Sequence, residues 1–378
     1  MFWKRFTIFR LLGFEVKLDL SWLLLALLIT WTLAEGVFPF HFPNLPVQTY
    51  WWMGAGGALG LLVSIVFHEL SHSLVARRYG LPIRSITLFI FGGVAEMDRE
   101  PPSPKAEFLM AVAGPIASMV LAVILYVAYQ TVQPIDWAIP VTGVLYYLAY
   151  LNMLLAVFNL VPAFPLDGGR MLRAALWGWK GNIRWATRIA SAAGSGFGLA
   201  LIILAVLAIL RGNFIAGMWW FLIGMFIRAA AGMSYQQLLM QETLRGERVH
   251  RFMNPAPITV PRSISLQALV EDYVYRYQFK MFPVTDNSRL FGCVTTRDVK
   301  TVRREDWPLR TVAEVLKPSS EENTIAPDAD ALEALSKMTR SSLSRLMVVE
   351  QGKLVGIIAL KDLLRFFSLK LELERQNI

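Results

Sequence analysis

The chain has 378 residues, of which 55% are hydrophobic and only 17% are charged, and its formal net charge is +9. Soluble domains contain about 25% charged residues, so this composition excludes a wholly soluble globular protein and favours a lipid bilayer as the partner that covers the apolar surface. The single cysteine excludes an intrachain disulfide, and the length allows two or three folded units.

Long apolar runs lie in the first two thirds of the chain and predict membrane-spanning helices, because each approaches the ~20 residues that cross the hydrocarbon core. The expected spans are 18–36, 52–77, 106–130, 141–162, 188–210 and 214–233. The first run is apolar enough for a signal peptide, but no small-residue cleavage site follows it, so we expect a retained anchor.

Lysine and arginine are unevenly distributed among the loops. The loops 37–51 and 131–140 contain none, whereas the alternate loops are basic, and the one between the fourth and fifth spans carries Arg170, Arg173, Lys180 and Arg184. Basic loops stay in the cytoplasm. The sequence therefore predicts a multi-pass protein of the cell inner membrane with both termini cytoplasmic. The same distribution accounts for the net charge, so no direct nucleic-acid binding is expected.

The second expected span contains the sequence His68-Glu69-Leu70-Ser71-His72. Residues four apart share a helix face, so the two imidazoles can bind one metal ion, and Glu69 is placed to accept a proton from the attacking water. Zinc suits nitrogen and oxygen ligands and acidifies water. The alternative is a pair of structural histidines bonded to neighbouring helices. It is disfavoured because ionisable groups inside a span are costly and mark functional sites.

Asp167 is the candidate for a third metal ligand, because catalytic zinc sites usually have three protein ligands and a water. It lies in the sequence NLVPAFPLDGGR over residues 159–170. The two prolines end the fourth helix, and the paired glycines allow the backbone to approach closely. Taken by itself, Asp167 could equally be the N-cap of a helix over 168–178.

Together, HELSH in an apolar span and the later NLVPAFPLDGGR resemble the site-2 protease family of intramembrane metalloproteases. The glycine-bearing loop around Gly92 and Gly93 and the AGP sequence at 113–115 resemble two further motifs of that family, so the resemblance covers roughly residues 15–232. It implies a polytopic α-helical domain over residues 1–233, with six transmembrane helices and a small β-hairpin or re-entrant loop.

The resemblance also implies the roles of individual residues. One zinc ion per chain would have three ligands, and a general base would lie beside it: His68, His72, Asp167 and, as the base, Glu69. Asn159 would lie near the substrate carbonyl, and Gly92 and Gly93 would help to hold the substrate as an extended strand. Ser118 stands where many relatives carry Asn, which leaves the role of that position open.

The implied activity is that of a zinc metalloendopeptidase in regulated intramembrane proteolysis. Its substrates would be single-span membrane proteins, such as an anti-sigma factor or a membrane-anchored transcription regulator. A substrate helix must unwind before cleavage, and pairing with the 84–97 loop would restore some of the lost backbone hydrogen bonds.

The remaining third of the chain reads as a linker helix over 234–250 followed by an internal repeat. Each unit reads strand, helix, strand, strand, helix, and the second repeats the pattern of the first: Ile258–Pro261, Met281–Val284 and Gly292–Asp298, then Thr324–Pro327, Leu346–Val349 and Gly356–Asp362. The pattern resembles a soluble α+β tandem of CBS domains, with boundaries 251–308 and 309–368 and a tail over 369–378.

The CBS resemblance suggests regulation by ATP or AMP. Asp298 would bind a ribose hydroxyl and Thr295 would lie near phosphate, whereas Ala359 weakens the corresponding site in the second unit. The alternative is a docking or dimerisation module without a ligand, and a homodimer through the CBS domains is an expected assembly.

Two other classes of function remain open. One is a CBS-gated transporter or channel that uses the His/Asp cluster as an ion site, although the spans show no inverted hydropathy repeat. The other is an inactive scaffold, which the intact ligand set and general base disfavour.

Overall fold

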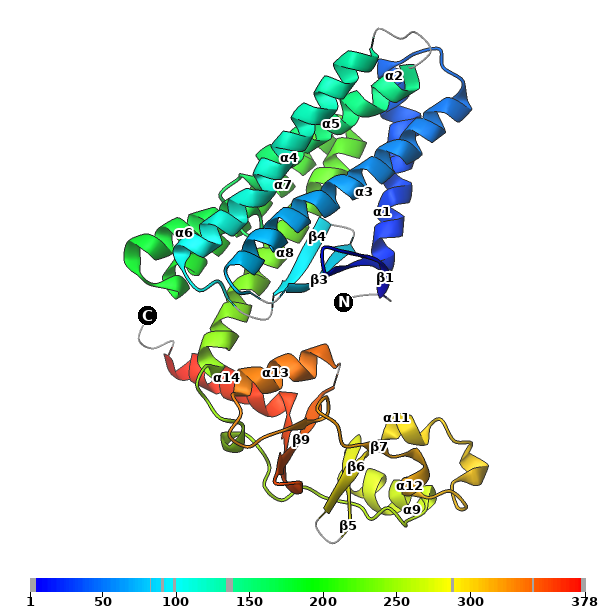
Figure 1. Cartoon of the computed structure of the whole chain (residues 1–378), viewed down its shortest axis with the longest axis vertical. Helices are drawn as coiled ribbons and strands as arrows, with labels where there is room; N and C mark the ends of the chain where they lie inside the picture. The colour runs from blue at the N-terminus through cyan, green and yellow to red at the C-terminus, as the bar shows by residue number, and fades with distance from the viewer. Residues whose placement is uncertain are drawn as a thin grey trace. The chain divides into compact units, whose positions relative to one another are not determined.

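The computed structural model describes residues 5–81, 83–89, 92–97, 100–133, 139–286, 289–341 and 343–374. The chain divides into two compact units, Met1–Leu238 and Leu239–Ile378 (Figure 1). The described residues include 6 helical segments that are long and apolar enough to cross a membrane. These are α1 (Leu20–Thr32) with its continuation to His41, α3 (Val47–Arg78), α4 (Pro104–Val132), α5 (Ile139–Asn159), α7 (Ile183–Leu210) and α8 (Phe214–Leu244). The expected six-helix membrane fold is confirmed.

The first span is not a single regular helix. A π-helical turn over Leu33–Val37 and the short helix α2 (Phe38–His41) continue α1. At the other end of the unit, α8 runs without a break past the expected last span to Leu244, into the region predicted to be a separate linker helix.

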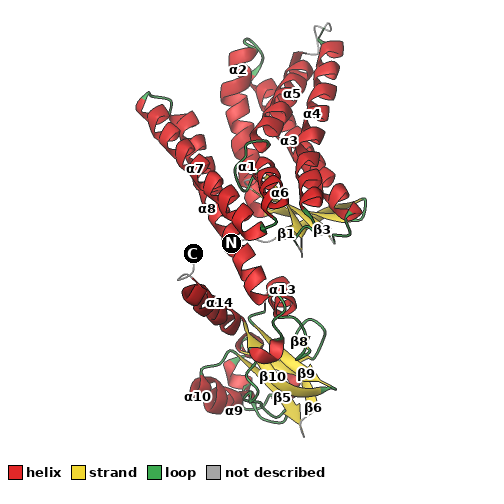
Figure 2. Cartoon of the chain, turned by 90° about the vertical axis from the view of Figure 1, so that its left-hand side faces the viewer, coloured by secondary structure: helices red, strands yellow, loops and turns green. Residues whose placement is uncertain are grey.

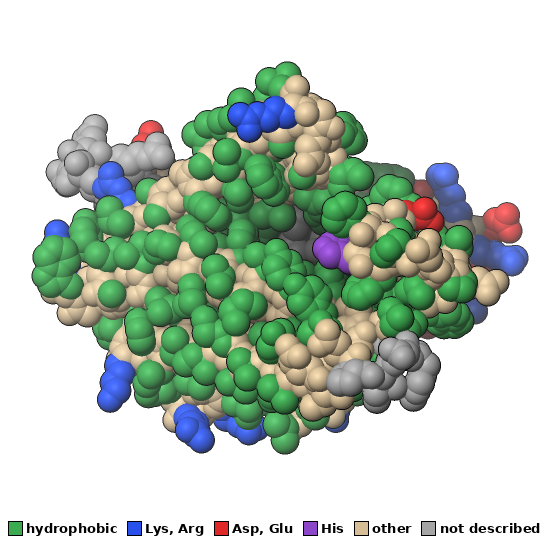
Figure 3. All heavy atoms as spheres, turned by 90° about the horizontal axis from the view of Figure 1, so that it is seen from above, with side chains coloured by type: hydrophobic (Ala, Val, Ile, Leu, Met, Phe, Trp, Pro, Cys, Tyr) green, Lys and Arg blue, Asp and Glu red, His purple; other side chains and the backbone are tan. Residues whose placement is uncertain are grey.

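Large hydrophobic side chains are exposed on the outside of this unit, as expected where lipid replaces water. Leu27 is 70% exposed and Trp52 is 78% exposed. In the space-filling view, hydrophobic side chains cover most of the visible face, and the Lys and Arg side chains lie mainly near its edge (Figure 3). We infer that these helices are covered by lipid.

A four-stranded sheet lies at one end of the helices (Figure 2). Its strands follow the order β1 (Arg5–Leu11), β2 (Phe14–Asp19), β3 (Ile83–Phe89) and β4 (Gly92–Met97). The hairpin expected near residues 84–97 is present as the antiparallel pair β3–β4, and β2 pairs with β3 in parallel. The sheet is larger than the sequence suggested, because Phe14 and Val16 are buried and anchor an N-terminal hairpin that was not predicted.

Helices α3 and α5 pack side by side through a regular series of contacts. Gly56 faces Val144, Gly60 faces Leu148, and Asn152 Nδ2 donates to Ser64 Oγ at 2.9 Å. Each pair recurs one helical turn after the last at a constant sequence separation of 88 residues, so the helices run parallel in a fixed register. A Cβ at Gly60 would lie 2.9 Å from Leu148 Cδ2, so glycine here lets the Leu148 side chain pack directly on the α3 backbone. One turn further, the same register brings His68 opposite the fully buried Ala156.

The turn after α5 leads directly into the amphipathic helix α6 (Asp167–Lys180). Leu166 is the N-cap and Asp167 is the first helical residue, so the N-cap role considered for Asp167 is not observed. A Cβ at Gly168 would collide with the carbonyl of Leu160, and one at Gly169 would lie 2.7 Å from the Ala163 oxygen. The paired glycines therefore let the start of α6 pack against the preceding loop.

The second unit is an α+β module built around one sheet. Its strand order is β5 (Met281–Asp286), β6 (Arg289–Thr295), β10 (Lys353–Ala359), β9 (Arg345–Glu350) and β8 (Thr324–Ile325), with β7 (Lys317–Pro318) paired to β6. The main helices are α13 (Ala331–Arg340) and α14 (Leu360–Glu374), and the shorter ones are α9 (Leu266–Ala268), α10 (Tyr275–Tyr277), α11 (Thr296–Val299) and α12 (Val312–Val315).

The predicted first strand of the first repeat is reduced to a single bridge between Val260 and Val284. Pro257 and Pro261 flank it and lack the N–H groups that a longer ladder needs. The corresponding strand of the second repeat, β8, pairs in parallel with β9. The α+β repeat expected from the sequence is therefore present.

Candidate active site

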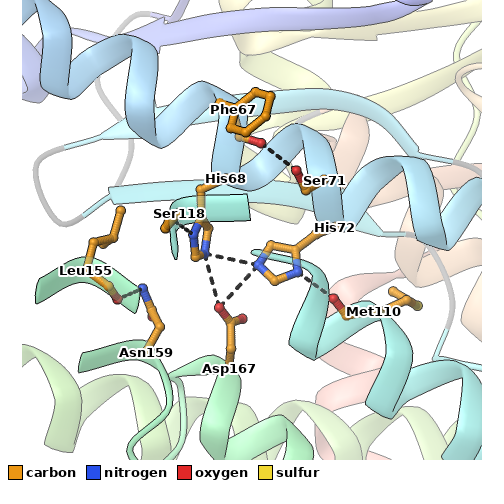
Figure 4. A network of polar contacts seen from close by, with 9 residues as sticks. All are labelled: Phe67, His68, Ser71, His72, Met110, Ser118, Leu155, Asn159 and Asp167. Carbon is orange, nitrogen blue, oxygen red and sulfur yellow. Dashed lines mark hydrogen bonds and ion pairs between the residues drawn. The ribbon is translucent and has the colours of Figure 1, made fainter. Parts of the chain in front are cut away.

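Three buried side chains from two distant segments meet inside the first unit (Figure 4). His68 and His72 come from α3, and Asp167 comes from the start of α6. The Nε2 atoms of His68 and His72 lie 3.1 and 3.2 Å from Asp167 Oδ2, and the two Nε2 atoms are 3.1 Å apart. Among the residues described, no second group of three such side chains lies close enough together to hold an ion.

The outer nitrogens of both imidazoles are held by α4. His72 Nδ1 lies 2.6 Å from the Met110 carbonyl oxygen, and His68 Nδ1 lies 2.8 Å from Ser118 Oγ. Hydrogen bonds of this kind fix the ring orientation and the tautomer of a metal-binding histidine. Both Nε2 atoms are therefore directed at the shared centre.

Gly114, on the same helix, leaves room for an ion at that centre. A Cβ at position 114 would lie 2.5 Å from His68 Nε2 and closer still to His72 Nε2. Protein ligands hold zinc at about 2.0–2.2 Å through imidazole nitrogen or carboxylate oxygen, so this donor set and this space fit a zinc ion. A methyl group at 114 would enter the space in front of both Nε2 atoms.

Glu69 projects beside the centre and meets the backbone of β4. A Cβ at Gly93 would lie 2.8 Å from the Glu69 carboxyl carbon and 2.9 Å from its Oε1 atom. Gly93 pairs with Leu88 across the hairpin, and Gly92 pairs with Phe89. The predicted base and the predicted substrate-binding strand are thus in direct proximity.

Asn159 is placed differently from the other predicted residues. It is the last residue of α5, and its Nδ2 atom donates to the Leu155 carbonyl at 3.0 Å. Figure 4 shows it to one side of the His68–His72–Asp167 triangle, without a dashed contact to any of the three.

Comparison with known proteins identifies the family. Residues 56–136 and 135–205 match the family model of Peptidase family M50, and residues 249–305 and 312–369 match that of the CBS domain. The zinc metalloprotease named Rip3 of Mycobacterium tuberculosis is 34% identical over 361 residues, which cover 95% of this chain and 92% of that protein. The chain belongs to the site-2 protease family.

A second relative agrees with this assignment, and one solved structure is similar in sequence. Zinc metalloprotease MJ0392 of Methanocaldococcus jannaschii is 33% identical over 84% of this chain and 86% of its own length. The solved structure of the Site-2 Protease from the same organism is 30% identical and covers 61% of this chain and 94% of that chain, with a TM-score of 0.44. The chain is a zinc metalloprotease with tandem CBS domains, and the predicted enzyme class is confirmed. The transporter and scaffold alternatives are not supported.

Sequence analysis missed part of the site of this site-2 protease. Ser118 was noted only as a departure from relatives, and Met110 was not singled out because its contribution is a backbone carbonyl. Met110, Gly114 and Ser118 are spaced four residues apart, so they share one face of α4. That spacing in the sequence was the signal that could have identified this face of α4 as part of the site.

Thr295 and Asp298 of the CBS module bind each other. Thr295 donates to Asp298 Oδ2 from its backbone N–H at 2.9 Å and from its hydroxyl at 2.6 Å, and the Asp298 N–H donates back to Thr295 Oγ1 at 3.3 Å, which completes a capping box at the start of α11. Lys317 Nζ lies 3.0 Å from Asp298 Oδ1. Both carboxylate oxygens of this predicted nucleotide-binding residue therefore have internal partners.

A small cavity of about 130 Å³ lies between the two repeats, lined by residues of the first, such as Met281 and Pro283, and of the second, such as Arg345, Lys361 and Asp362. Typical ligand pockets have volumes of ~300–1,000 Å³, so this cavity is smaller than a nucleotide needs.

Proposed function

We propose that His68, His72 and Asp167 hold one zinc ion and that the chain cleaves single-span membrane proteins in the cytoplasmic half of the bilayer. The observation that carries the proposal is the buried convergence of three ligand-type side chains, two of them on α3, which is long enough to span a membrane and also carries Glu69. Polar and ionisable groups are expensive in such a place unless they perform a function.

Zinc, when bound, polarises the scissile carbonyl and makes an adjacent water acidic. Glu69 accepts the proton of the attacking water and returns a proton to the leaving amine. The contact between Glu69 and the backbone at Gly93 limits where this carboxylate can lie. His68 and His72 keep fixed orientations through Ser118 and Met110, so the reacting groups meet in one geometry.

The substrate is proposed to bind as an extended segment along β4. This strand lies at the edge of its sheet, so its outer backbone groups can pair with an added strand. A substrate helix has its own carbonyls bonded internally, and pairing with β4 compensates for the bonds broken when it unwinds. Gly92 and Gly93 allow close approach at the end of β4 nearest the turn, and Asn159 would bind the substrate carbonyl after leaving Leu155.

The proposed location is the inner membrane, with both termini in the cytoplasm. The support is the alternation of basic and non-basic loops along the chain. The proposed substrates are membrane-anchored regulators of transcription, such as anti-sigma factors, because cleavage at the cytoplasmic side would release their soluble part.

The CBS module is proposed to regulate cleavage by binding ATP or AMP and to support a homodimer. Asp298 and Thr295 remain the proposed ribose and phosphate contacts, and they would have to exchange their mutual hydrogen bonds for the ligand. Comparing ATP-dependent changes in proteolysis between the full chain and a chain ending at residue 244 tests this regulation. An identical nucleotide effect in both chains would contradict it.

The decisive test of the proposed chemistry is Glu69→Gln. We expect the variant to retain one zinc per chain and to lose ~10²–10⁴-fold in the cleavage rate of a single-span substrate, because the general base is removed and the ligands are not. Glu35→Gln is the matched control, since Glu35 is an exposed glutamate of the first span. Full activity in zinc-loaded Glu69→Gln protein would overturn the proposal.

A further inference from the structure

A second buried polar cluster lies between α4 and α6, separate from the three proposed ligands. Arg173 is 6% exposed and Glu107 is 2% exposed. Arg173 Nε donates to Glu107 Oε1 at 2.5 Å, and Arg173 Nη2 also contacts that oxygen. The same Nη2 atom reaches Glu100 Oε2 at 3.1 Å. This cluster takes no part in the chemistry described above.

On α4, Glu107 belongs to the helix face that supports the histidines. Glu107, Met110, Gly114 and Ser118 follow at intervals of three or four residues, so they line one face. Met110 and Ser118 hold the two imidazoles, and Gly114 faces the space between them. A group bound to Glu107 is therefore bound to the helix that sets the positions of both rings.

On the other side, Arg173 belongs to the helix that begins with Asp167. It lies six residues further along α6, about 9 Å by the helical rise. Its guanidinium group also lies over the ring of Phe164, 5.2 Å from the centroid, in the loop that leads to Asp167. Arg173 thus contacts Phe164 in the loop before Asp167. It also links α6, the helix that begins at Asp167, to α4.

Stability alone is a poor explanation for this pair. Glu107 Oε2 is buried, and no group among the described residues donates a hydrogen bond to it. Burying two charges costs desolvation energy, and replacement of such pairs by apolar side chains of similar volume is often neutral or stabilising. What apolar side chains cannot supply is the directional contact between one carboxylate and a planar guanidinium.

We propose that Arg173 is a positioning residue for Asp167: its ion pair with Glu107 fixes α6 against α4 so that the carboxylate meets the two imidazoles. The inference rests on the proposed function, in which Asp167 is a metal ligand. Loss of a supporting partner of a metal ligand typically weakens metal binding by 10–100-fold.

The test compares zinc affinity with stability in the full-length protein in detergent. The variants are Glu107→Met/Arg173→Met, which removes both charges, and Arg173→Lys, which keeps the charge and removes the planar fork. Zinc dissociation constants are measured by competition with a chromophoric chelator, and Tm is measured on the metal-free protein. Co²⁺ absorption spectra report the geometry of the ligand set. Arg10→Met, which breaks the exposed Arg10–Glu15 pair, is the control.

We expect both test variants to bind zinc 10–100-fold more weakly, with altered Co²⁺ spectra and a metal-free Tm within about 4 °C of the parent. A zinc affinity within about threefold of the parent, with an unchanged Co²⁺ spectrum, would overturn the inference, because supporting partners typically contribute at least tenfold. A parallel fall of Tm and affinity in both variants would also overturn it, because the pair would then be only structural.

Asp167→Ala separates this outcome from a failure of the proposed function. If Asp167→Ala loses zinc and the Arg173 variants do not, the ligand assignment stands and the positioning role of Arg173 is wrong. If Asp167→Ala retains the parent affinity, the ligand assignment itself is wrong, and the positioning role fails with it.

Discussion

The two units differ in how far apart in the sequence their interacting polar residues lie. In the membrane unit, His68 contacts Asp167, which is 99 residues away in the sequence. In the second unit, Thr295 forms a hydrogen bond with Asp298, which is only 3 residues away. A polar side chain within a spanning helix either bonds back to a carbonyl one turn away, as Asn159 does to Leu155, or pairs with another element, as His68 does with Asp167. Near a short soluble helix, capping supplies a local partner. A polar motif inside a span is therefore stronger evidence of a site than a similar motif at a loop end.

The largest effect is expected when a ligand is removed from the membrane unit. His72→Ala should abolish stoichiometric zinc binding and cleavage together, because two remaining donors make a weak zinc site. Metal analysis of purified protein and cleavage of a single-span substrate provide the measurement. His250→Ala, in the second unit, should leave both unchanged. Retention of one tightly bound zinc in His72→Ala would remove His72 from the site.

A methyl group in the ion's space should have nearly the same effect. Gly114→Ala is expected to prevent zinc binding, since its Cβ would approach both Nε2 atoms too closely. Gly196→Ala on α7 is the matched control, because a Cβ there meets nothing within 4 Å. The control should be neutral or slightly stabilising, since alanine favours helix by roughly 0.5–1 kcal/mol. Equal zinc content in the two variants would show that the space in front of Gly114 is not the metal position.

A smaller effect is expected at the hydroxyl that orients His68. Ser118→Ala removes the 2.8 Å contact to His68 Nδ1 and should weaken zinc binding by 10–100-fold without abolishing it. Ser191→Ala is a fair comparison, because Ser191 Oγ is buried and no described group forms a hydrogen bond with it. Chelator competition gives both affinities. If the two serine variants behave alike, the hydroxyl of Ser118 does not support the site.

The smallest effect is expected in the second unit and depends on pH. Burial raises the pKa of the Asp298 carboxyl, but the hydrogen bonds from Thr295 and Lys317 outweigh burial and leave this pKa below the ordinary value. The charged form is therefore favoured on folding. Its contribution to stability is present above about pH 4 and is lost as the pH falls through the lower folded pKa.

Asp298→Asn should accordingly lower the unfolding temperature of the second unit by a few degrees at pH 7, and this difference should shrink below pH 4. Calorimetry of the full chain between pH 7 and pH 3 provides the measurement. Asp328→Asn serves as the control, because the ion pair that Asp328 forms with Arg248 is exposed. A Tm difference that is independent of pH would show that the charge of Asp298 is not what stabilises the cap.

Much of the membrane unit could be predicted from the sequence because its signals are strong. Apolar runs of spanning length, the spacing of His68 and His72, and the glycines after Asp167 each have few alternative explanations. The N-terminal hairpin could not be predicted, because charged residues alternate with Phe14 and Val16 in a stretch that also reads as a basic flank. Arg173 was counted among the loop cations, and only the packing of α6 on α4 reveals its burial.

In the second unit, the repeat was visible but its details depended on backbone chemistry. The prolines around Val260 shorten a strand that the hydrophobic pattern favours. The sequence pattern singled out Thr295 and Asp298 as nucleotide contacts, but the pattern alone does not distinguish a ligand contact from a capping box. Both use the same hydroxyl and carboxylate.

The parallel register of α3 and α5 restricts how a substrate can reach the catalytic groups. The two helices interlock at Gly60 and Leu148 and again at Ser64 and Asn152, directly before the turn that carries His68. Lateral diffusion in the bilayer therefore offers no passage between this pair. A substrate of the proposed kind would have to reach Glu69 by another route, on the side where this residue lies next to Gly93 of β4.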